Sequence, residues 1–220
     1  MTRDELRQHI LSIGVIPAVR VATAAEALFA AEAVASGGIP IVEITLTVAG
    51  AVEVIHDLIA CSPKMIVGAG TVVDPETALR CIDAGAHFIT SPGMKESVVR
   101  AARERKTLVI PGAMTPSEVL SCWESGADFV KVFPCSALAG PAYIRTLKRP
   151  FPHIPMIAAG GINQQNAAEY IFSGADAVGI GGSLIAPESV RHHEAKRIRE
   201  LARRYLTIVA EARRQLQGRT

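Results

Sequence analysis

Short apolar segments rich in β-branched residues alternate along the chain with stretches whose apolar residues recur at helical spacing. Apolar runs of this length, bounded by turn residues, are typical of strands buried in a parallel sheet. The stretches between them, such as AAEALFAAEAVASG, DPETALRCIDAG, KESVVRAARERK and NQQNAAEYIFSG, have the period of helices. The eight predicted strands are Val15–Val19, Pro40–Ile44, Met65–Ala69, Phe88–Thr90, Thr107–Ile110, Phe129–Val132, Met156–Ala158 and Ala177–Ile180.

A turn of small residues, which ends a helix and opens a strand, occurs four times: ASGGIP, DAGAHF, ESGADF and FSGADAV. The first glycines of these turns, Gly37, Gly85, Gly126 and Gly174, are 48, 41 and 48 residues apart. Glycine suits the residue after a helix because it adopts a left-handed backbone without steric penalty. Each repeat therefore spans two strand–helix modules, and four repeats predict a closed (β/α)8 TIM barrel.

A doubly wound sheet is the alternative for an alternating chain, but its dinucleotide-binding signature is missing. The segment GAGTVV after the third strand is not G-x-G-x-x-G, and no acidic residue ends a second strand about twenty residues further on. With no change of composition and no linker, the sequence predicts one barrel domain over residues 1–220, with an extra N-terminal helix over 1–14 and a C-terminal helical segment over 189–220. Asp74 and Asn163 are predicted helix N-caps.

Composition and charge narrow the class of protein. Apolar residues make up 49% of the 220 and charged residues 20%, as in folded proteins rather than disordered ones. No apolar run is long enough to cross a membrane and the N-terminus does not resemble a signal peptide, so we expect a cytoplasmic protein with no membrane partner. The four cysteines form no C-x-x-C pair and are expected to be free thiols. The basic excess lies after residue 190, on a predicted amphipathic helix, and matches no nucleic-acid motif, so no nucleic-acid partner is expected.

Lys131, in the segment GADFVKVFP, ends a predicted buried strand at the end of the barrel where active sites lie. One interpretation is a structural lysine whose amine pairs with Glu43 on another strand. The other is a desolvated amine with an unprotonated fraction, which attacks a ketone to form an imine. Glu43, in the apolar segment IVEITL, is the only acidic residue predicted at this end of any strand, and it could move the protons that such chemistry requires.

The last two strands end in the glycine-rich loops AAGGIN and GIGGSL, and a helix is predicted after each. Barrels commonly bind phosphate at these two loops through backbone N–H groups, assisted by a helix N-terminus. The sequence therefore favours a phosphorylated or otherwise anionic ligand, with plain tight turns as the alternative.

These segments together resemble the 2-keto-3-deoxy-6-phosphogluconate (KDPG) aldolase family. The segments VIPAVR, GGIPIVEITLT, IVGAGTV, AGAHFITSPGM, VIPGAMTPSE, KVFP, GGIN and VGIGGSLI are similar to those of the family, in the same order and along nearly the whole chain. The resemblance implies a class I aldolase on a (β/α)8 barrel, usually a homotrimer. Such an enzyme cleaves its phosphorylated keto acid to pyruvate and glyceraldehyde 3-phosphate without a metal or other cofactor.

Carried over by position, the resemblance implies that Lys131 is the Schiff-base lysine and Glu43 the general acid and base. It also implies that Thr71 and Pro92 line the pyruvyl end of the site, and that Phe133 packs beside the imine. The residues that match the phosphate-binding turns are Gly160, Gly161, Gly181, Gly182 and Ser183.

The chain departs from the family pattern at three places. Thr47 stands where many members have an arginine that grips the substrate carboxylate; this chain resembles the branch with E-I-T-x-T and an arginine after the first strand, here Arg20. We therefore predict Arg20 as the carboxylate clamp, because a guanidinium offers a bidentate match, and keep Thr47 among the substrate-binding residues. Ala159 replaces a threonine, and Cys135 begins a longer spacing to Gly140.

Three classes of function follow. The first is a lyase that cleaves KDPG through a Lys131 imine, with 4-hydroxy-2-oxoglutarate or 2-keto-3-deoxy-6-phosphogalactonate as alternative substrates. The second is a phosphosugar isomerase or epimerase, in which Lys131 is only an electrostatic group. The third is a phosphate-binding module without catalysis, which has no need of a buried acid and amine. The six histidines show no metal-binding spacing, so no metal site is predicted.

Overall fold

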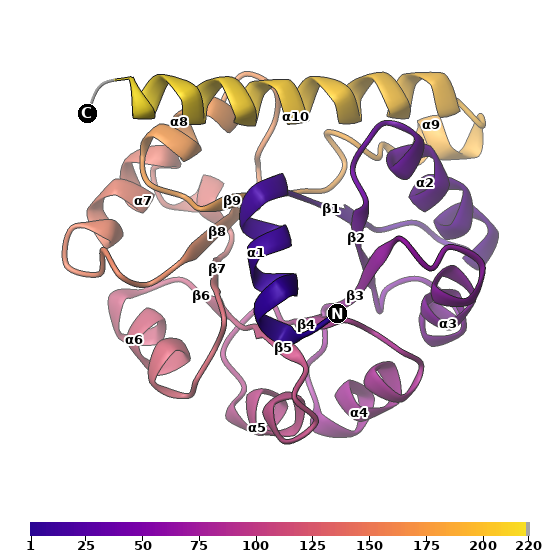
Figure 1. Ribbon diagram of the computed structural model, residues 1–220, viewed down its shortest axis with the longest axis horizontal. Coiled ribbons are helices and arrows are strands. Elements are labelled where there is room, and N and C mark those ends of the chain that lie inside the picture. The colour runs from indigo at the N-terminus through magenta and orange to yellow at the C-terminus, as the bar shows by residue number, and fades with distance from the viewer. Residues whose placement is uncertain (219–220) are drawn as a thin grey trace.

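Helices surround a ring of parallel strands in the computed structural model, which describes residues 1–218 (Figure 1). Every strand pairing is parallel, and β1 joins the two halves of the sheet by pairing with both β2 and β9. The strands are β1 (Val15–Val19), β2 (Ile41–Thr45), β3 (Ile66–Gly70), β4 (Phe88–Thr90), β5 (Leu108–Ile110), β6 (Gly112–Ala113), β7 (Val130–Val132), β8 (Met156–Ala159) and β9 (Ala177–Ile180). The predicted barrel and its alternation of strand and helix are confirmed.

The ring closes through β5 and β6, which occupy a single barrel position. β5 pairs with β4, β6 pairs with β7, and only Pro111 separates the two. Proline has no backbone N–H and therefore interrupts a ladder of hydrogen bonds. The sequence-based prediction ended the fifth strand at Ile110 and therefore missed the short strand Gly112–Ala113.

Most helices cover the outside of the ring, and four of those described begin at a residue whose side chain caps the helix. Thr2, Thr23 and Thr115 form capping boxes with a glutamate three residues on, and Asp74 accepts a hydrogen bond from the amide of Thr77, as predicted for an N-cap. The helices are α1 (Arg3–Ile13), α2 (Ala24–Ser36), α3 (Ala51–Cys61), α4 (Pro75–Asp83), α5 (Glu96–Glu104), α6 (Pro116–Glu124), α7 (Pro141–Lys148), α8 (Ala167–Phe172), α9 (Pro187–Arg191) and α10 (Ala195–Gln217), with a 3₁₀ turn at Cys135–Ala137.

The predicted N-cap at Asn163 is wrong. The Asn163 side chain accepts hydrogen bonds from the amides of Gln165 and Asn166, which closes a tight turn, and α8 begins only at Ala167. Asparagine bonds its own backbone two residues on in this way, so the same side-chain chemistry serves a turn as readily as a helix.

Three of the four repeated turns have the predicted left-handed glycine, namely Gly85, Gly126 and Gly174. In the first turn Gly38 has φ of 98°, whereas Gly37 is right-handed with φ of −83°. A β-carbon on Gly37 would lie 2.6 Å from the β-carbon of Ala202 on α10, so Gly37 is needed for close helix packing instead. In ASGGIP, Gly38 therefore provides the left-handed turn, and Gly37 leaves space for α10.

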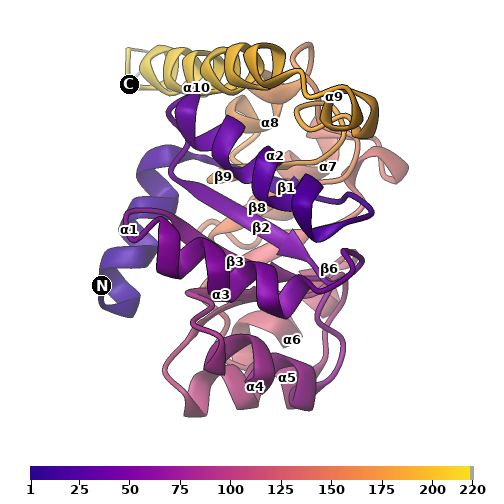
Figure 2. The same ribbon diagram turned by 90° about the vertical axis from the view of Figure 1, so that its right-hand side faces the viewer.

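The two terminal helices decide which end of the barrel is open. α1 lies across the end from which the strands start (Figure 1), and in Figure 2 the arrow of β2 points away from it. Two arginines of α1 hold it there. Arg3 forms an ion pair of 2.7 Å with Asp128, and Arg7 lies over the ring of Phe129. Asp128 and Phe129 directly precede β7. The extra N-terminal helix was predicted, and the carboxyl ends of the strands remain accessible at the other end.

The C-terminal segment forms α9 and α10 rather than one helix. α10 runs alongside α8, α2 and α9 (Figure 1) and buries its apolar side chains against them. Residues 219 and 220 of the predicted segment lie outside the described residues. Among residues 1–218, no helix combines the length and apolar character that a membrane crossing requires. The buried residues of α10 are Ile198, Ala202, Tyr205, Val209 and Ala212.

Candidate active site

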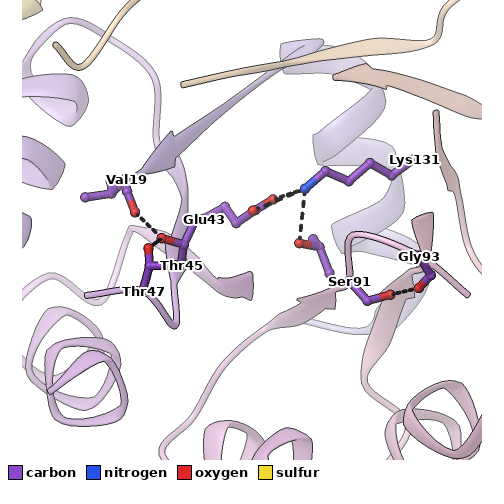
Figure 3. A network of polar contacts seen from close by, with 8 residues as sticks. Val19, Glu43, Thr45, Thr47, Ser91, Gly93 and Lys131 are labelled. Carbon is purple, nitrogen blue, oxygen red and sulfur yellow. Dashed lines mark hydrogen bonds and ion pairs between the residues drawn. The ribbon is translucent and has the colours of Figure 1, made fainter. Parts of the chain in front are cut away.

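Lys131 and Glu43 meet inside the open end of the barrel. β7 and β2 lie on opposite sides of the ring, and each directs one of these side chains inward. The Lys131 Nζ lies 3.3 Å from both carboxylate oxygens of Glu43 (Figure 3). The two side chains are only 13% and 5% exposed. An ion pair removed from water to this extent is costly to form unless its geometry is good and further hydrogen bonds satisfy both charges.

Thr90 completes the polar contacts of the amine. Its side chain is 1% exposed at the end of β4, and its Oγ1 lies 3.5 Å from Lys131 Nζ. Sequence reasoning overlooked Thr90. The signal was present, because Phe88 and Thr90 share one face of the strand and a polar residue at an inward position near the strand end points into the site.

Gly70, the last residue of β3, makes room for the Glu43 carboxylate. A β-carbon on Gly70 would lie 2.2 Å from Glu43 Oε1 and 2.6 Å from Glu43 Cδ, which is far inside van der Waals contact. Glycine in a strand often marks such a close approach. Sequence reasoning used the GAG segment as evidence against a dinucleotide site and as part of the family resemblance, so this role was missed.

The pair lies in the wall of a cavity of about 320 Å³ that opens toward the strand ends. Phe133 also lines it, with Lys131 Nζ 5.7 Å from the centre of its ring, at the range of a cation–π contact. Arg20 lines the cavity from the end of β1, is exposed, and makes no hydrogen bond or ion pair with any residue in 1–218. Because Ala18 pairs with Glu43 across the sheet, Arg20, on the same face two residues on, stands one layer above Glu43. An unpartnered guanidinium here is positioned to bind an anion.

The two glycine-rich turns form the rest of the cavity wall. Gly160 and Gly161 have φ of 86° and 82°, and nothing lies within 4 Å of where β-carbons on Gly181 and Gly182 would be. Within the described residues, the amides of Gly161, Gly182 and Ser183 donate no hydrogen bond. Unsatisfied amides on neighbouring turns form a concave group of donors suited to an anion. The expected help from a helix N-terminus is absent here, since α8 begins at Ala167 and α9 at Pro187, several residues after these turns.

Thr47, Thr71 and Pro92 lie outside the cavity lining. The Thr47 hydroxyl is 2.6 Å from that of Thr45, which donates to the carbonyl of Val19 (Figure 3). Thr47 and Thr71 line a separate depression on the outside of the strand ends, and Pro92 is exposed. Thr71 has φ of 63°, a strained value for a β-branched residue, directly after the glycine that accommodates Glu43.

Cys135 does not line the cavity, and its thiol is not reactive. Burial raises the pKa of the Cys135 thiol to about 11, and its Sγ donates to the carbonyl of Val132 at 3.0 Å. A thiol in this state is a poor nucleophile. Across residues 1–218, no three His, Cys, Asp or Glu side chains are grouped as metal ligands would be.

Comparison with known proteins gives one family. The model for the family "KDPG and KHG aldolase" matches residues 6–201. The chain is 31% identical to the 2-dehydro-3-deoxy-phosphogluconate aldolase of Pseudomonas aeruginosa over 91% of both chains, and 33% identical to the KHG/KDPG aldolase of Escherichia coli K12 over 89% of this chain and 92% of the relative.

Solved structures of KDPG aldolases superimpose on this chain. The crystal structure of KDPG aldolase from Legionella pneumophila, with pyruvate captured at low pH as a covalent carbinolamine intermediate, is 31% identical and superimposes with a TM-score of 0.83 over 90% of this chain and 96% of that one. The KDPG aldolase of Zymomonas mobilis ZM4 with 3-phosphoglycerate is 26% identical, with a TM-score of 0.83 over 94% and 97%. The family resemblance of the sequence is confirmed, and the chain belongs to the KDPG and KHG aldolase family, whose members are lyases that act on carbon–carbon bonds.

Proposed function

We propose that this protein is a class I aldolase that reversibly cleaves KDPG to pyruvate and glyceraldehyde 3-phosphate through an imine on Lys131. The observation that carries the proposal is the placement of the Lys131 amine, 3.3 Å from both oxygens of Glu43, in the wall of a cavity that also contains unpaired backbone donors. A structural lysine would also pair with Glu43. The cavity and the covalent pyruvate adduct of the Legionella relative favour the catalytic interpretation.

The pair supplies the proton transfers of imine formation. Glu43 takes a proton from the Lys131 ammonium, and the neutral amine attacks C2 of the keto acid. Glu43 returns the proton to the former carbonyl oxygen, removes another from the nitrogen, and protonates the hydroxyl, which leaves as water. The product is a protonated imine beside a Glu43 carboxylate. A carboxylate within hydrogen-bonding reach of the reacting atoms suits this role.

Cleavage then uses the imine as an electron sink. The Glu43 carboxylate takes the proton of the C4 hydroxyl, the C3–C4 bond breaks, and its electron pair forms an enamine between C3 and C2. The aldehyde departs. Glu43 returns its proton to C3, and water hydrolyses the pyruvate imine, which restores the Lys131 ammonium. Thr90, at 3.5 Å from Nζ, helps to hold the amine in place.

We propose that Arg20 binds the carboxylate of the keto acid and that the glycine turns bind the phosphate at the other end. The position of Arg20 one layer above Glu43 supports the first assignment. The free amides of Gly161, Gly182 and Ser183 support the second, and the Zymomonas relative was crystallised with 3-phosphoglycerate. Substrate contacts from Thr47, Thr71 and Pro92 stay predictions.

Two other keto acids are alternative substrates for the same imine chemistry. 4-Hydroxy-2-oxoglutarate has a distal carboxylate that could occupy the same amides, and the Escherichia coli relative is named for both activities. 2-Keto-3-deoxy-6-phosphogalactonate differs from KDPG in configuration at C4. We favour the phosphorylated substrates because a phosphate can accept from more of the free amides than a carboxylate can.

We also propose that the protein is a homotrimer, as its family resemblance implies. Val73 is 56% exposed beside the outer depression that contains Thr47 and Thr71. An apolar side chain at that position is suited to a subunit contact. Sedimentation equilibrium would give the number of subunits, and a monomer at micromolar concentration would contradict the assignment.

The decisive experiment is trapping of the imine. The protein is incubated with pyruvate and borohydride, with and without chelator, and the adduct is located by peptide mass spectrometry. We expect reduction to fix pyruvate on Lys131 in both samples and Lys131→Ala to give neither adduct nor turnover. Arg20→Ala should raise the pyruvate concentration for half-maximal trapping about tenfold, since a charge-assisted pair is lost. Folded protein without an adduct at Lys131 would instead support an isomerase or epimerase.

A further inference from the structure

Tyr205 is a buried tyrosine whose hydroxyl is unsatisfied. It lies on the inner face of α10, its side chain is fully buried, and its Oη has no hydrogen-bond partner in the described part of the chain. A buried hydroxyl without a partner destabilises the folded protein, and native structures contain few of them. The position therefore calls for an explanation other than packing, which phenylalanine would serve as well.

Ser183, in the second glycine turn, is a polar neighbour of this phenol. Burial raises the pKa of the Tyr205 phenol to about 12, and the nearby Ser183 side chain opposes that shift. The Ser183 side chain is thus near the phenol, although no hydrogen bond between the two is formed in residues 1–218. Ser183 itself is exposed and lines the cavity, so it stands between the buried phenol and the space for the ligand.

The Ser183 hydroxyl can bond to a ligand in the cavity and to the Tyr205 phenol at the same time. Serine has one hydrogen to donate and two lone pairs that accept. If Ser183 donates its hydrogen to an anion in the cavity, its lone pairs are left for a donor from behind. A phenol that keeps its proton at neutral pH is such a donor, and hydrogen bonds in a chain strengthen one another.

We propose that Tyr205 is a positioning residue for anion binding: its hydroxyl donates to Ser183 when Ser183 turns to donate to the phosphate of the substrate. The inference rests on the proposed phosphate site and extends it to α10, the C-terminal helix, which contacts no substrate atom. Binding of the anion then satisfies a donor that is unsatisfied in the free protein, so part of the binding free energy comes from relief of that defect.

Tyr205→Phe tests the proposal because it removes the hydroxyl and keeps the ring. Binding of inorganic phosphate is measured by calorimetry, and imine formation by borohydride trapping with pyruvate. We expect Tyr205→Phe to weaken phosphate binding about threefold to tenfold, the effect of one hydrogen bond, with pyruvate trapping unchanged. The melting temperature in phosphate-free buffer should not fall, because no formed bond is lost. Tyr170→Phe is the matched control, since Tyr170 is also buried but lies on α8 with its hydroxyl beside Gly140.

A double-mutant cycle shows whether Tyr205 acts through Ser183. In a Ser183→Ala background, Tyr205→Phe should cause no further loss of phosphate affinity. Equal affinity of Tyr205→Phe and the wild type, independent losses in the cycle, or a lower melting temperature of Tyr205→Phe without phosphate would each overturn the inference while leaving the phosphate site intact. Failure of the wild type to bind phosphate would overturn both, and the wild-type measurement separates that case.

Discussion

Replacement of Gly70 by alanine should disable Glu43 without removing it. The added β-carbon would lie 2.2 Å from Glu43 Oε1, and contacts under 3.0 Å are essentially never seen. The carboxylate must therefore retreat by at least about 0.8 Å, away from Lys131 and the substrate. A misplacement of about 1 Å in a catalytic group can cost on the order of 100-fold in rate. We expect kcat of Gly70→Ala to fall about 10- to 100-fold.

The assay should isolate the step that depends on Glu43. Exchange of the methyl protons of pyruvate for deuterium, followed by NMR, reports proton removal from C3 of the imine without any aldehyde. The exchange rate should fall as kcat does, while borohydride still traps pyruvate on Lys131. The stability change should be modest, because overpacking costs about 1–3 kcal/mol and replacing glycine gains about 0.4–1 kcal/mol through the unfolded state.

Glu43→Gln is the matched control for Gly70→Ala. In that background the carboxylate is already absent, so Gly70→Ala should add little further loss of exchange. An exchange rate of Gly70→Ala close to that of the wild type would show that Glu43 tolerates the displacement or is not the proton carrier. A full additional loss in the Glu43→Gln background would show that Gly70 acts through some other group.

Two further predictions follow from the contacts of Thr90 and His87. Thr90→Val removes the hydroxyl 3.5 Å from the Lys131 amine and should lower kcat several-fold, with Lys131 still trapped by pyruvate; an unchanged kcat would contradict a role for this contact. Burial lowers the pKa of His87 below its ordinary value of 6.5, and its Nδ1 lies 3.2 Å from the amide of Val67, which donates to it. Because the unfolded state then binds the proton more readily, the free energy of unfolding should fall as the pH falls through about 6.5 and level off below the folded pKa. His87→Gln should flatten this slope between pH 7.5 and 5 in thermal unfolding, and an unchanged slope would exclude His87 as its source.

The sequence alone determined the barrel and the two residues at its centre. The period of apolar residues and the glycine-bearing turns depend on local backbone geometry, which neighbouring residues along the chain express directly. Lys131 and Glu43 could be found because a charged residue stands out on a buried strand, and the barrel places all strand ends at one face. The structure brings their side chains together, as this reading of the strands predicted.

The tertiary structure decided everything that depends on contacts between distant segments. Gly37 is needed for α10, which lies more than 150 residues further along the chain, and Gly70 is needed for Glu43 on a neighbouring strand. Nothing in the local sequence distinguishes these glycines from those of a turn. Thr90 has a place in the site because the Lys131 amine reaches it across the barrel. The role proposed for Tyr205 likewise depends on Ser183, which lies in another segment. Such roles come from packing in three dimensions, where the space and the unpaired donors around a side chain are set by residues that its own segment does not contain.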